Sequence, residues 1–449
     1  MRLPVRLAVL VSALLAASIS LSQTNALPNV DSLVAAYFDA PDDAVRAEAL
    51  KAIKDRKDVT IQQVEDAVRR GVWYKPEASG TFTRKITVEF NRQETDCTFY
   101  VPPGYDPKKS YPALLVMHGT GGTGEKFLDR WLPYVTKRNM IVIAPTQVSG
   151  VDGPSGKPFG KGAGYGAQPL ERSTPISAIH AARRTYNIDS DRITMTGCSM
   201  GAHCTWDTMI QRTDYFAGGI PEAGIPMVEG FQLARYMSLG NFFQARMWVM
   251  QGTPDKDQPG VNQHATDEMK KLGCPVEYRQ YEGRGHGTYP EESDKALDFV
   301  SAGARDVYCR KVTKITHHAV DGRAYWLRID KLKDVEWDPR GRVDVHISAE
   351  TSSTEVLRRA LDFVQRHFGR VDGEIKDNNV IELKTRYVSS VTLFLHDKLV
   401  DLDKPVTVVI NGKSYKKTVK RDVGFMLDEV RRGMDTQRTF YGFLKMNVY

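Results

Sequence analysis

The chain contains few cysteines for its length, and their spacing matches no zinc-binding pattern. There are five among 449 residues, at positions 97, 198, 204, 274 and 309. An odd number leaves at least one thiol outside any disulfide, and we predict that Cys198 and Cys204 pack as small apolar groups. The sequence therefore indicates no metal site, and it carries no motif for a cofactor.

Long apolar runs are also scarce. The first residues carry Arg2 and Arg6 ahead of an apolar run, and polar residues then lead to the small residue Ala26. This order is typical of a secretory signal peptide, and the run is short for a bilayer span. We therefore expect residues 1–26 to be removed and the mature chain to be exported, to the periplasm or outside the cell, without a membrane span.

Neither sign of charge dominates. There are 62 Lys and Arg against 55 Asp and Glu, a formal charge of +7 that falls to +5 when Arg2 and Arg6 leave with the signal. The basic residues are scattered, which does not favour a nucleic-acid partner. One local cluster, which we interpret as the solvated edge of a strand, comprises Lys416, Lys417, Lys420 and Arg421.

After the signal, residues 27–75 carry apolar side chains at helical spacing. Asp42 and Thr60 stand where helix N-caps are expected. We interpret this part as a small helical segment that packs on the domain following it.

Residues 76–303 predict an α/β fold. Short strand-like runs include "RKITVEF", "CTFYVPP", "ALLVMHG", "MIVIAPT", "RITMTG", "GGIPEAG", "RMWVMQG" and "VEYRQYEG". From the third run onward they alternate with helical stretches, and several are apolar throughout, as in strands covered on both faces. This pattern favours a doubly wound, mostly parallel sheet.

Residues 304–449 predict a β-rich accessory domain. Its short strand-like runs are "KITHHAV", "AYWLRIDKL", "RVDVHISA", "NVIELKT", "SVTLFLHD", "PVTVVING" and "KSYKKTV". Two helices are expected, at "STEVLRRALDFVQRHFG" and "FMLDEVRRGMD". Asn411-Gly412 and Asp321-Gly322 are hairpin-turn signals. Tyr325 and Trp326 would be candidates for carbohydrate binding if they form an exposed pair. The alternative is that one of the two belongs to the core, because neighbours on a strand face opposite ways.

The segment Gly197-Cys198-Ser199-Met200-Gly201 has the form G-x-S-x-G. It follows the apolar run "RITMTG" and precedes a helical stretch, which is the setting of a nucleophile elbow on a sharp strand-to-helix turn. Ser199 is therefore the candidate nucleophile.

A serine nucleophile of this kind needs an acid and then a histidine, in that order along the chain and after later strands. Asp255 follows "RMWVMQG" and His286 follows "VEYRQYEG". Asp257 is the rival acid, two residues further on. The weaker histidine candidates are His203, His264, His317 and His318.

An oxyanion hole needs backbone N–H groups where negative charge develops. The first is expected from Met200, the residue after the nucleophile. The second is expected from the glycine-rich loop "HGTGG" after an early strand, with Thr120 as donor and Gly121 as the alternative.

With these parts in place, the chain from about Thr81 to Ala302 resembles secreted α/β-hydrolase esterases of the polyhydroxyalkanoate-depolymerase and feruloyl/acetylxylan-esterase type. It is also similar to the related predicted peptidases and the phospholipase/carboxylesterase group. The segments that carry the resemblance are "TGCSMGAHCTWD", "VMHGTGG", "QGTPD" and "GRGHG". The resemblance implies Ser199, Asp255 and His286 as a catalytic triad, and Cys198 and Ala202 are small departures from the usual pattern.

The sequence thus predicts a serine hydrolase acting on carboxylic esters, whose substrate could be polymeric. A serine peptidase would use the same triad and stays an alternative, and a non-catalytic binding protein with a hydrolase-like domain is a third. The insert "SGVDGPSGKPFGKGAGYGAQPLERST" is expected either to border the site, with Phe159 and Tyr165 near the substrate, or to be a plain surface loop.

Overall fold

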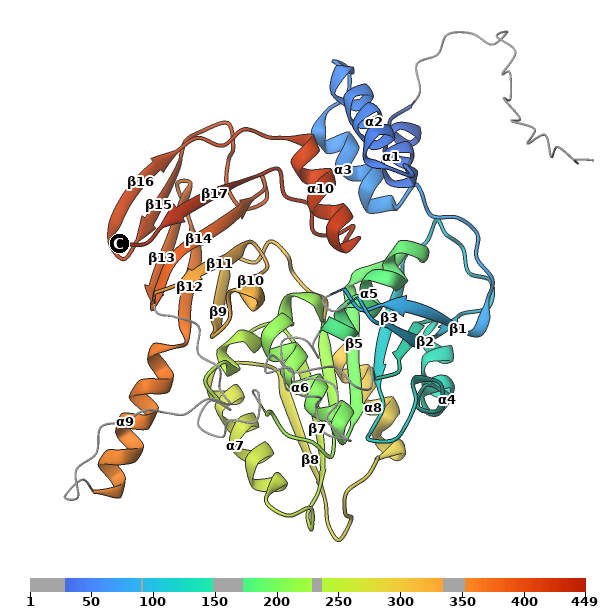
Figure 1. The fold of residues 1–449 in the computed structure, drawn as a ribbon, viewed down its shortest axis with the longest axis vertical. Coiled ribbons are helices and arrows are strands. Elements are labelled where there is room, and N and C mark those ends of the chain that lie inside the picture. The colour runs from blue at the N-terminus through green and yellow to red at the C-terminus, as the bar shows by residue number, and fades with distance from the viewer. Residues whose placement is uncertain (1–28, 90–91, 148–172, 228–235, 334–351) are drawn as a thin grey trace, which may run out of the picture.

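The computed structural model describes residues 29–89, 92–147, 173–227, 236–333 and 352–449 (Figure 1). The predicted signal peptide, the insert with Phe159 and Tyr165, and the strand expected at residues 342–349 lie outside the described residues.

The central sheet has eight strands in the order β1-β2-β4-β3-β5-β6-β7-β8. The strands β1 to β8 are Gly80–Thr87, Glu94–Val101, Tyr111–Met117, Ile141–Pro145, Ile188–Cys198, Gly218–Glu222, Arg246–Gly252 and Val276–Tyr281. The pairs β1–β2 and β2–β4 are antiparallel, and the remaining pairs are parallel. This is the α/β-hydrolase arrangement, and the prediction of a doubly wound, mostly parallel sheet is confirmed.

Helices cover both faces of this sheet (Figure 1). On one face lie α4 (Gly124–Val135) and α8 (Ser293–Ser301). On the other lie α5 (Ser173–Thr185), α6 (Met200–Arg212) and α7 (Gln258–Lys271). In β3, Leu114 and Val116 join the first layer and Leu115 joins the second, which explains why this strand is apolar at every position.

The N-terminal segment forms three helices, α1 (Val30–Asp39), α2 (Asp43–Asp55) and α3 (Ile61–Arg70). Asp42 and Thr60 cap α2 and α3 through side-chain hydrogen bonds, as their sequence positions predict. The expectation that these helices pack on the next domain is wrong in its main part. Their apolar side chains share one hydrophobic cluster with the C-terminal β-strands and not with the central sheet.

The C-terminal part contains two sheets, with orders β10-β11-β14-β17 and β16-β15-β13-β12-β9. The strands β9 to β17 are Lys311–Thr316, Arg323–Ala324, Leu327–Leu332, Gly369–Lys376, Val380–Arg386, Val388–Leu395, Val406–Ile410, Lys413–Lys417 and Gly442–Asn447. The helices here are α9 (Ser353–Arg366) and α10 (Val423–Gly433), close to the positions that the sequence predicts. The β-rich C-terminal domain is therefore confirmed, although β12 and β17 were not expected.

Asn411 and Gly412 both have positive φ angles and join β15 to β16, so this hairpin prediction is confirmed. β16 is the edge strand that carries Lys416 and Lys417, which agrees with a solvated strand edge. The prediction of a hairpin at Asp321-Gly322 is wrong. β9 and β10 on either side of it belong to different sheets, and residues 319–321 form a 3-10 turn.

Tyr325 and Trp326 are 1% and 0% exposed, so the prediction of an exposed pair for carbohydrate binding is wrong. The sequence argument allowed only one of them to be buried, because neighbours on a strand face opposite sides. Both can be buried because these two residues form the tight link between β10 and β11, where Tyr325 has a positive φ of 50°. The indole N–H of Trp326 donates to the Cys309 carbonyl.

The buried side chain of Arg305 links the C-terminal domain to the central sheet through ion pairs. The fully buried Arg305 side chain donates to Asp191 of β5 at 2.8 Å and to Asp435, just after α10, at 2.7 Å. Burial opposes ionisation of Asp435, but Arg305 and Arg183 outweigh it and hold the pKa of this carboxyl well below its usual range. The two domains are therefore joined by buried charges as well as by apolar contacts.

We expect Arg305→Met to lower the free energy of unfolding by about 3–5 kcal/mol, because it leaves buried carboxylates without their main partner. Arg310→Met is the matched control, since Arg310 pairs with Asp377 on the surface and should cost about 1 kcal/mol or less. Denaturant unfolding of both variants measures the difference. Equal, small losses would show that Arg305 does not hold the domains together.

Candidate active site

Ser199 lies between β5 and α6 and has a φ of 57°, in the left-handed region that non-glycine residues rarely adopt. The sharp turn explains the neighbouring glycines. A Cβ on Gly197 would lie 2.3 Å from the Gly201 carbonyl oxygen, and one on Gly201 would lie 2.0 Å from the Met117 carbonyl oxygen. The sequence pattern is thus required by close packing of backbone against backbone at this turn.

The structure brings Ser199, His286 and Asp255 together from three different loops. Ser199 Oγ lies 2.7 Å from His286 Nε2, and His286 Nδ1 lies 2.8 Å from Asp255 Oδ2. Asp255 is 8% exposed, whereas the side chain of His286 is 43% exposed. With the Nδ1 proton donated to the carboxylate, Nε2 is the ring nitrogen that can accept the serine proton.

The rival residues lie elsewhere. Asp257 is exposed and precedes α7. His203 Nδ1 contacts the backbone of Ile225, and the His264 ring packs edge-on against Tyr236. Two further candidates, His317 and His318, lie in the C-terminal part with ring centroids 4.3 Å apart and ring planes tilted by 50°.

Two amides behind Asp255 were not found from the sequence. Gln251 Nε2 donates to Asp255 Oδ2 at 2.7 Å, and Asn262 Nδ2 donates to Gln251 Oε1 at 3.0 Å. Gln251 and Asn262 are both 0% exposed, so they fix the carboxylate from inside the protein. The only available signal was their position, Gln251 at the end of β7 and Asn262 one turn into α7.

The loop after β3 passes close to Ser199. A Cβ on Gly119 would lie 3.7 Å from Ser199 Cβ. The Gly119 carbonyl accepts from Gly122 N–H at 3.0 Å and lies 2.7 Å from His118 Nδ1. His118 Nε2 accepts from Gln147 N–H at 3.0 Å, so Nδ1 carries the proton and donates to this carbonyl. Burial lowers the pKa of His118, in agreement with a neutral ring.

Cys198, next to Ser199, is buried. Burial raises the pKa of its thiol to about 12, so it stays protonated and does not compete with Ser199 as a nucleophile. All five cysteines of the chain lie within the described residues, and none is bonded to another.

A buried ion pair lies beneath these loops. Both guanidinium Nη atoms of Arg130 in α4 donate to the two carboxylate oxygens of Glu222, each at 2.7 Å, and the Glu222 side chain is 0% exposed. The same carboxylate accepts from Tyr289 N–H, three residues after His286, and the Glu222 carbonyl accepts from Ser199 N–H. Glu222 therefore connects the serine turn to the histidine loop.

We expect Arg130→Met to lower the free energy of unfolding by about 3–5 kcal/mol, because the Glu222 carboxylate would stay buried without a cation. Arg130→Met/Glu222→Gln should recover part of this loss, so a double-mutant cycle measures the coupling. The control is Lys137→Met, since Lys137 and Asp294 form an exposed pair that should be worth about 1 kcal/mol or less. A near-zero coupling energy would contradict the anchoring role.

Across the described ranges, His, Cys, Asp and Glu side chains form no group of three suited to holding a metal ion. In those same ranges no helix has both the length and the apolar character needed to cross a bilayer.

No protein-family model and no curated protein matches the chain. Among solved structures it is similar to a thermostable esterase, with 20% identity and a TM-score of 0.39 over 50% of this chain and 63% of that one. It is similar to a ferulic acid esterase at 18% identity and a TM-score of 0.39, over 50% of this chain and 99% of that one. A third is S-formylglutathione hydrolase from Staphylococcus aureus, at 12% identity and a TM-score of 0.39, over 50% and 100% of the two chains.

Proposed function

We propose that this protein is an exported serine hydrolase that cleaves carboxylic esters through an acyl-enzyme. Ser199 is the nucleophile, His286 the general base and Asp255 the acid that orients it. The observation that carries the proposal is the unbroken chain of hydrogen bonds from Ser199 Oγ through His286 to Asp255. Export rests on the signal-like residues 1–26, and the preference for esters rests on the sequence resemblance.

In the first half-reaction Ser199 Oγ attacks the ester carbonyl carbon while His286 Nε2 takes the hydroxyl proton. The imidazolium formed is stabilised by Asp255, and it then gives this proton to the leaving alcohol. A water molecule, deprotonated by His286, attacks the acyl-enzyme in the same way. The acid is released and Ser199 regains its proton.

The negative charge of each tetrahedral intermediate needs N–H donors, which we assign to Met200 and Thr120. Met200 begins α6, and the first N–H groups of a helix have no partner within it. The Thr120 N–H belongs to the same planar peptide as the Gly119 carbonyl, so it points away from the groups that hold that carbonyl.

The test uses the purified mature protein with p-nitrophenyl acetate and a dipeptide amide. We expect turnover of the ester, and labelling by a fluorophosphonate probe that peptide mass mapping places on Ser199. Faster cleavage of the amide would make the protein a peptidase with the same nucleophile. No labelling and no turnover of either substrate would leave only a binding function and would overturn the proposal.

A further inference from the structure

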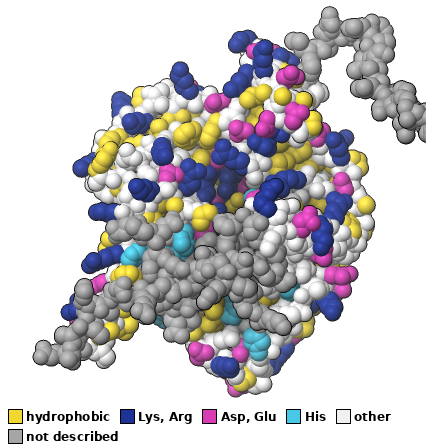
Figure 2. Space-filling view, in the orientation of Figure 1, with side chains coloured by type: hydrophobic (Ala, Val, Ile, Leu, Met, Phe, Trp, Pro, Cys, Tyr) yellow, Lys and Arg dark blue, Asp and Glu magenta, His cyan; other side chains and the backbone are white. Residues whose placement is uncertain are grey.

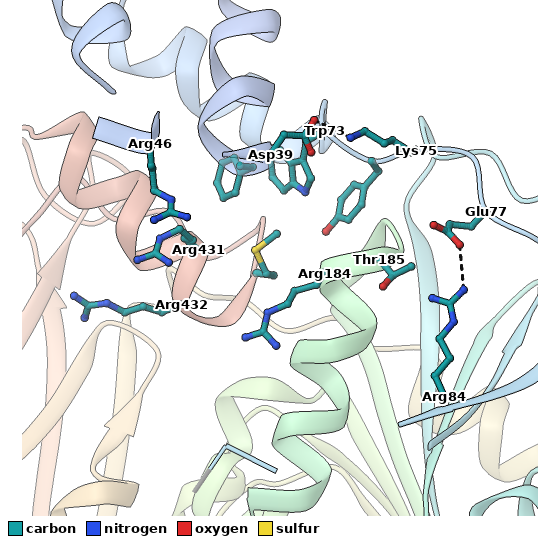
Figure 3. A pocket seen from close by; sticks show the side chains of 13 residues that line it. Asp39, Arg46, Trp73, Lys75, Glu77, Arg84, Arg184, Thr185, Arg431 and Arg432 are labelled. Carbon is teal, nitrogen blue, oxygen red and sulfur yellow. Dashed lines mark hydrogen bonds and ion pairs between the residues drawn. The ribbon is translucent and has the colours of Figure 1, made fainter. Parts of the chain in front are cut away.

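A pocket of about 560 Å³ lies away from Ser199, where the N-terminal helices, α5 and α10 meet (Figure 3). Its size is that of pockets that hold small molecules. Basic side chains from separate parts of the chain line it, and only two acidic residues, Asp39 and Glu77, do so. The basic residues are Arg46, Lys75, Arg84, Arg184, Arg431 and Arg432.

Figure 2 shows Lys and Arg side chains gathered near the centre of the face drawn there, between the C-terminal sheets and the N-terminal helices. In Figure 3, Arg184 extends from α5 and Arg431 and Arg432 extend from α10, which faces it, with the Arg432 side chain directed away from Arg184. The two acidic lining residues pair with Lys75 and Arg84, and each remaining cation has a carboxylate beside it on its own side of the pocket.

The carboxylates beside these arginines satisfy only part of each guanidinium. Arg432 gives one Nη to Glu429 and Arg184 gives one Nη to Glu89. Arg431 Nε lies 3.6 Å from Asp428, outside hydrogen-bond range. A guanidinium has five N–H donors, and exposed pairs of this kind contribute about 0–1 kcal/mol each. The arginines can therefore turn to a bound anion at little cost.

The opposite wall of the pocket is aromatic. The rings of Phe38 and Trp73 stack with centroids 3.8 Å apart. Trp73 is 6% exposed, and its indole N–H is buried without a hydrogen-bond partner among the described residues. The Nε of Arg46, another lining residue, is also buried and unpartnered within that part of the chain. The stacked rings give the pocket an apolar wall beside its basic one.

We propose that this junction pocket binds a small organic anion that carries at least two carboxylate or phosphate groups. The arginines of α5 and α10 hold the anionic oxygens, because planar guanidinium forks match carboxylate and phosphate in paired hydrogen bonds. The aromatic wall packs against the body of the ligand. This site is independent of the proposed esterase chemistry.

The experiment is titration calorimetry of the full chain with citrate and, separately, with inorganic pyrophosphate. We expect binding of at least one of them at low ionic strength, weakened in about 0.5 M salt, where charges are screened within a few ångströms. Binding of one anion alone supports the site and identifies carboxylate or phosphate as its ligand group. Sorbitol, a neutral polyol that carries neither a charge nor an ester group, should not bind.

Arg431→Gln/Arg432→Gln should weaken the binding at least about tenfold, as expected for lost hydrogen bonds to charged groups. Arg184→Gln tests the facing element separately, in case the double variant fails to fold. Arg310→Gln is the matched control, because Arg310 forms an exposed ion pair outside the pocket. This variant should bind the anion with the same affinity as the unmodified protein. No binding of either anion at low ionic strength, or an equal loss in Arg310→Gln, would overturn the proposal.

Discussion

Replacing Ser199 with alanine should abolish fluorophosphonate labelling and lower kcat/KM on p-nitrophenyl acetate by at least about 10⁴-fold. The variant removes only the oxygen that attacks the ester. Alanine keeps the Cβ that Ser199 already carries at its positive φ, so the turn gains no new strain. We therefore expect an unchanged circular dichroism spectrum and a midpoint of thermal unfolding close to that of the unmodified protein.

Ser301→Ala is the matched control, because Ser301 is exposed at the end of α8, away from the candidate site. It should label and turn over like the unmodified protein. If the folded Ser199→Ala variant still labels at full strength on another serine, the nucleophile has been assigned to the wrong residue.

Asp255→Asn should lower kcat by about 10³- to 10⁴-fold. Asp255 Oδ2 accepts hydrogen bonds both from His286 Nδ1 and from Gln251 Nε2. An asparagine oxygen can take the place of Oδ2, but it is a weaker acceptor than a carboxylate, and the amide nitrogen can take that place instead and oppose the Nδ1 proton. The imidazole then loses its counter-charge and is less firmly held in one tautomer. Steady-state kinetics on the same ester measures the effect.

The control is Asp257→Asn, two residues further along. Asp257 is exposed and no hydrogen bond joins it to His286 in the described structure, so its loss should change kcat by less than about threefold, the effect expected of a surface substitution. A larger loss in Asp257→Asn than in Asp255→Asn would mean that the acid is two residues away from our assignment.

The sequence predicted the eight strands of the central sheet because their signals are local. Each is a short strand-like run bounded by turn residues, several of the runs are apolar throughout, and Ser199, Asp255 and His286 each follow one of them. Parallel strands bring their carboxyl ends to one edge of a sheet, so strand order alone was enough to expect these three residues close together.

Contacts between segments far apart in the chain could not be predicted, because no local sequence pattern indicates them. Nothing near Arg130 indicates that it pairs with Glu222, and nothing near Gln251 indicates Asn262 behind it, because an ordinary arginine or amide looks the same in a sequence whether it is buried or solvated. The prediction of what α1 to α3 pack against was wrong for the same reason. The amphipathic faces of these helices show that one side of each is covered, but they do not show which part of the chain covers it.

β12 was missed because its buried face is half glycine. The inward positions of the strand are Gly369, Val371, Gly373 and Ile375. A Cβ on Gly373 would lie 2.8 Å from the ring of Trp326, so the glycine makes room for the buried indole. The strand therefore shows too few apolar residues to be recognised by its own pattern, and its partner indole was misjudged as exposed.

The packing of α1 to α3 on the C-terminal strands also determines how late during synthesis these helices can reach their final contacts. Glu65 in α3 accepts hydrogen bonds from His396 and from Tyr441, whose hydroxyl is 376 residues away along the chain. At roughly 5–20 residues per second, the ribosome needs roughly 20 to 75 s to make that stretch. During this interval the apolar faces of α1 to α3 lack the surface that covers them in the folded protein. The earliest helices to be synthesised are thus among the last to reach their final contacts.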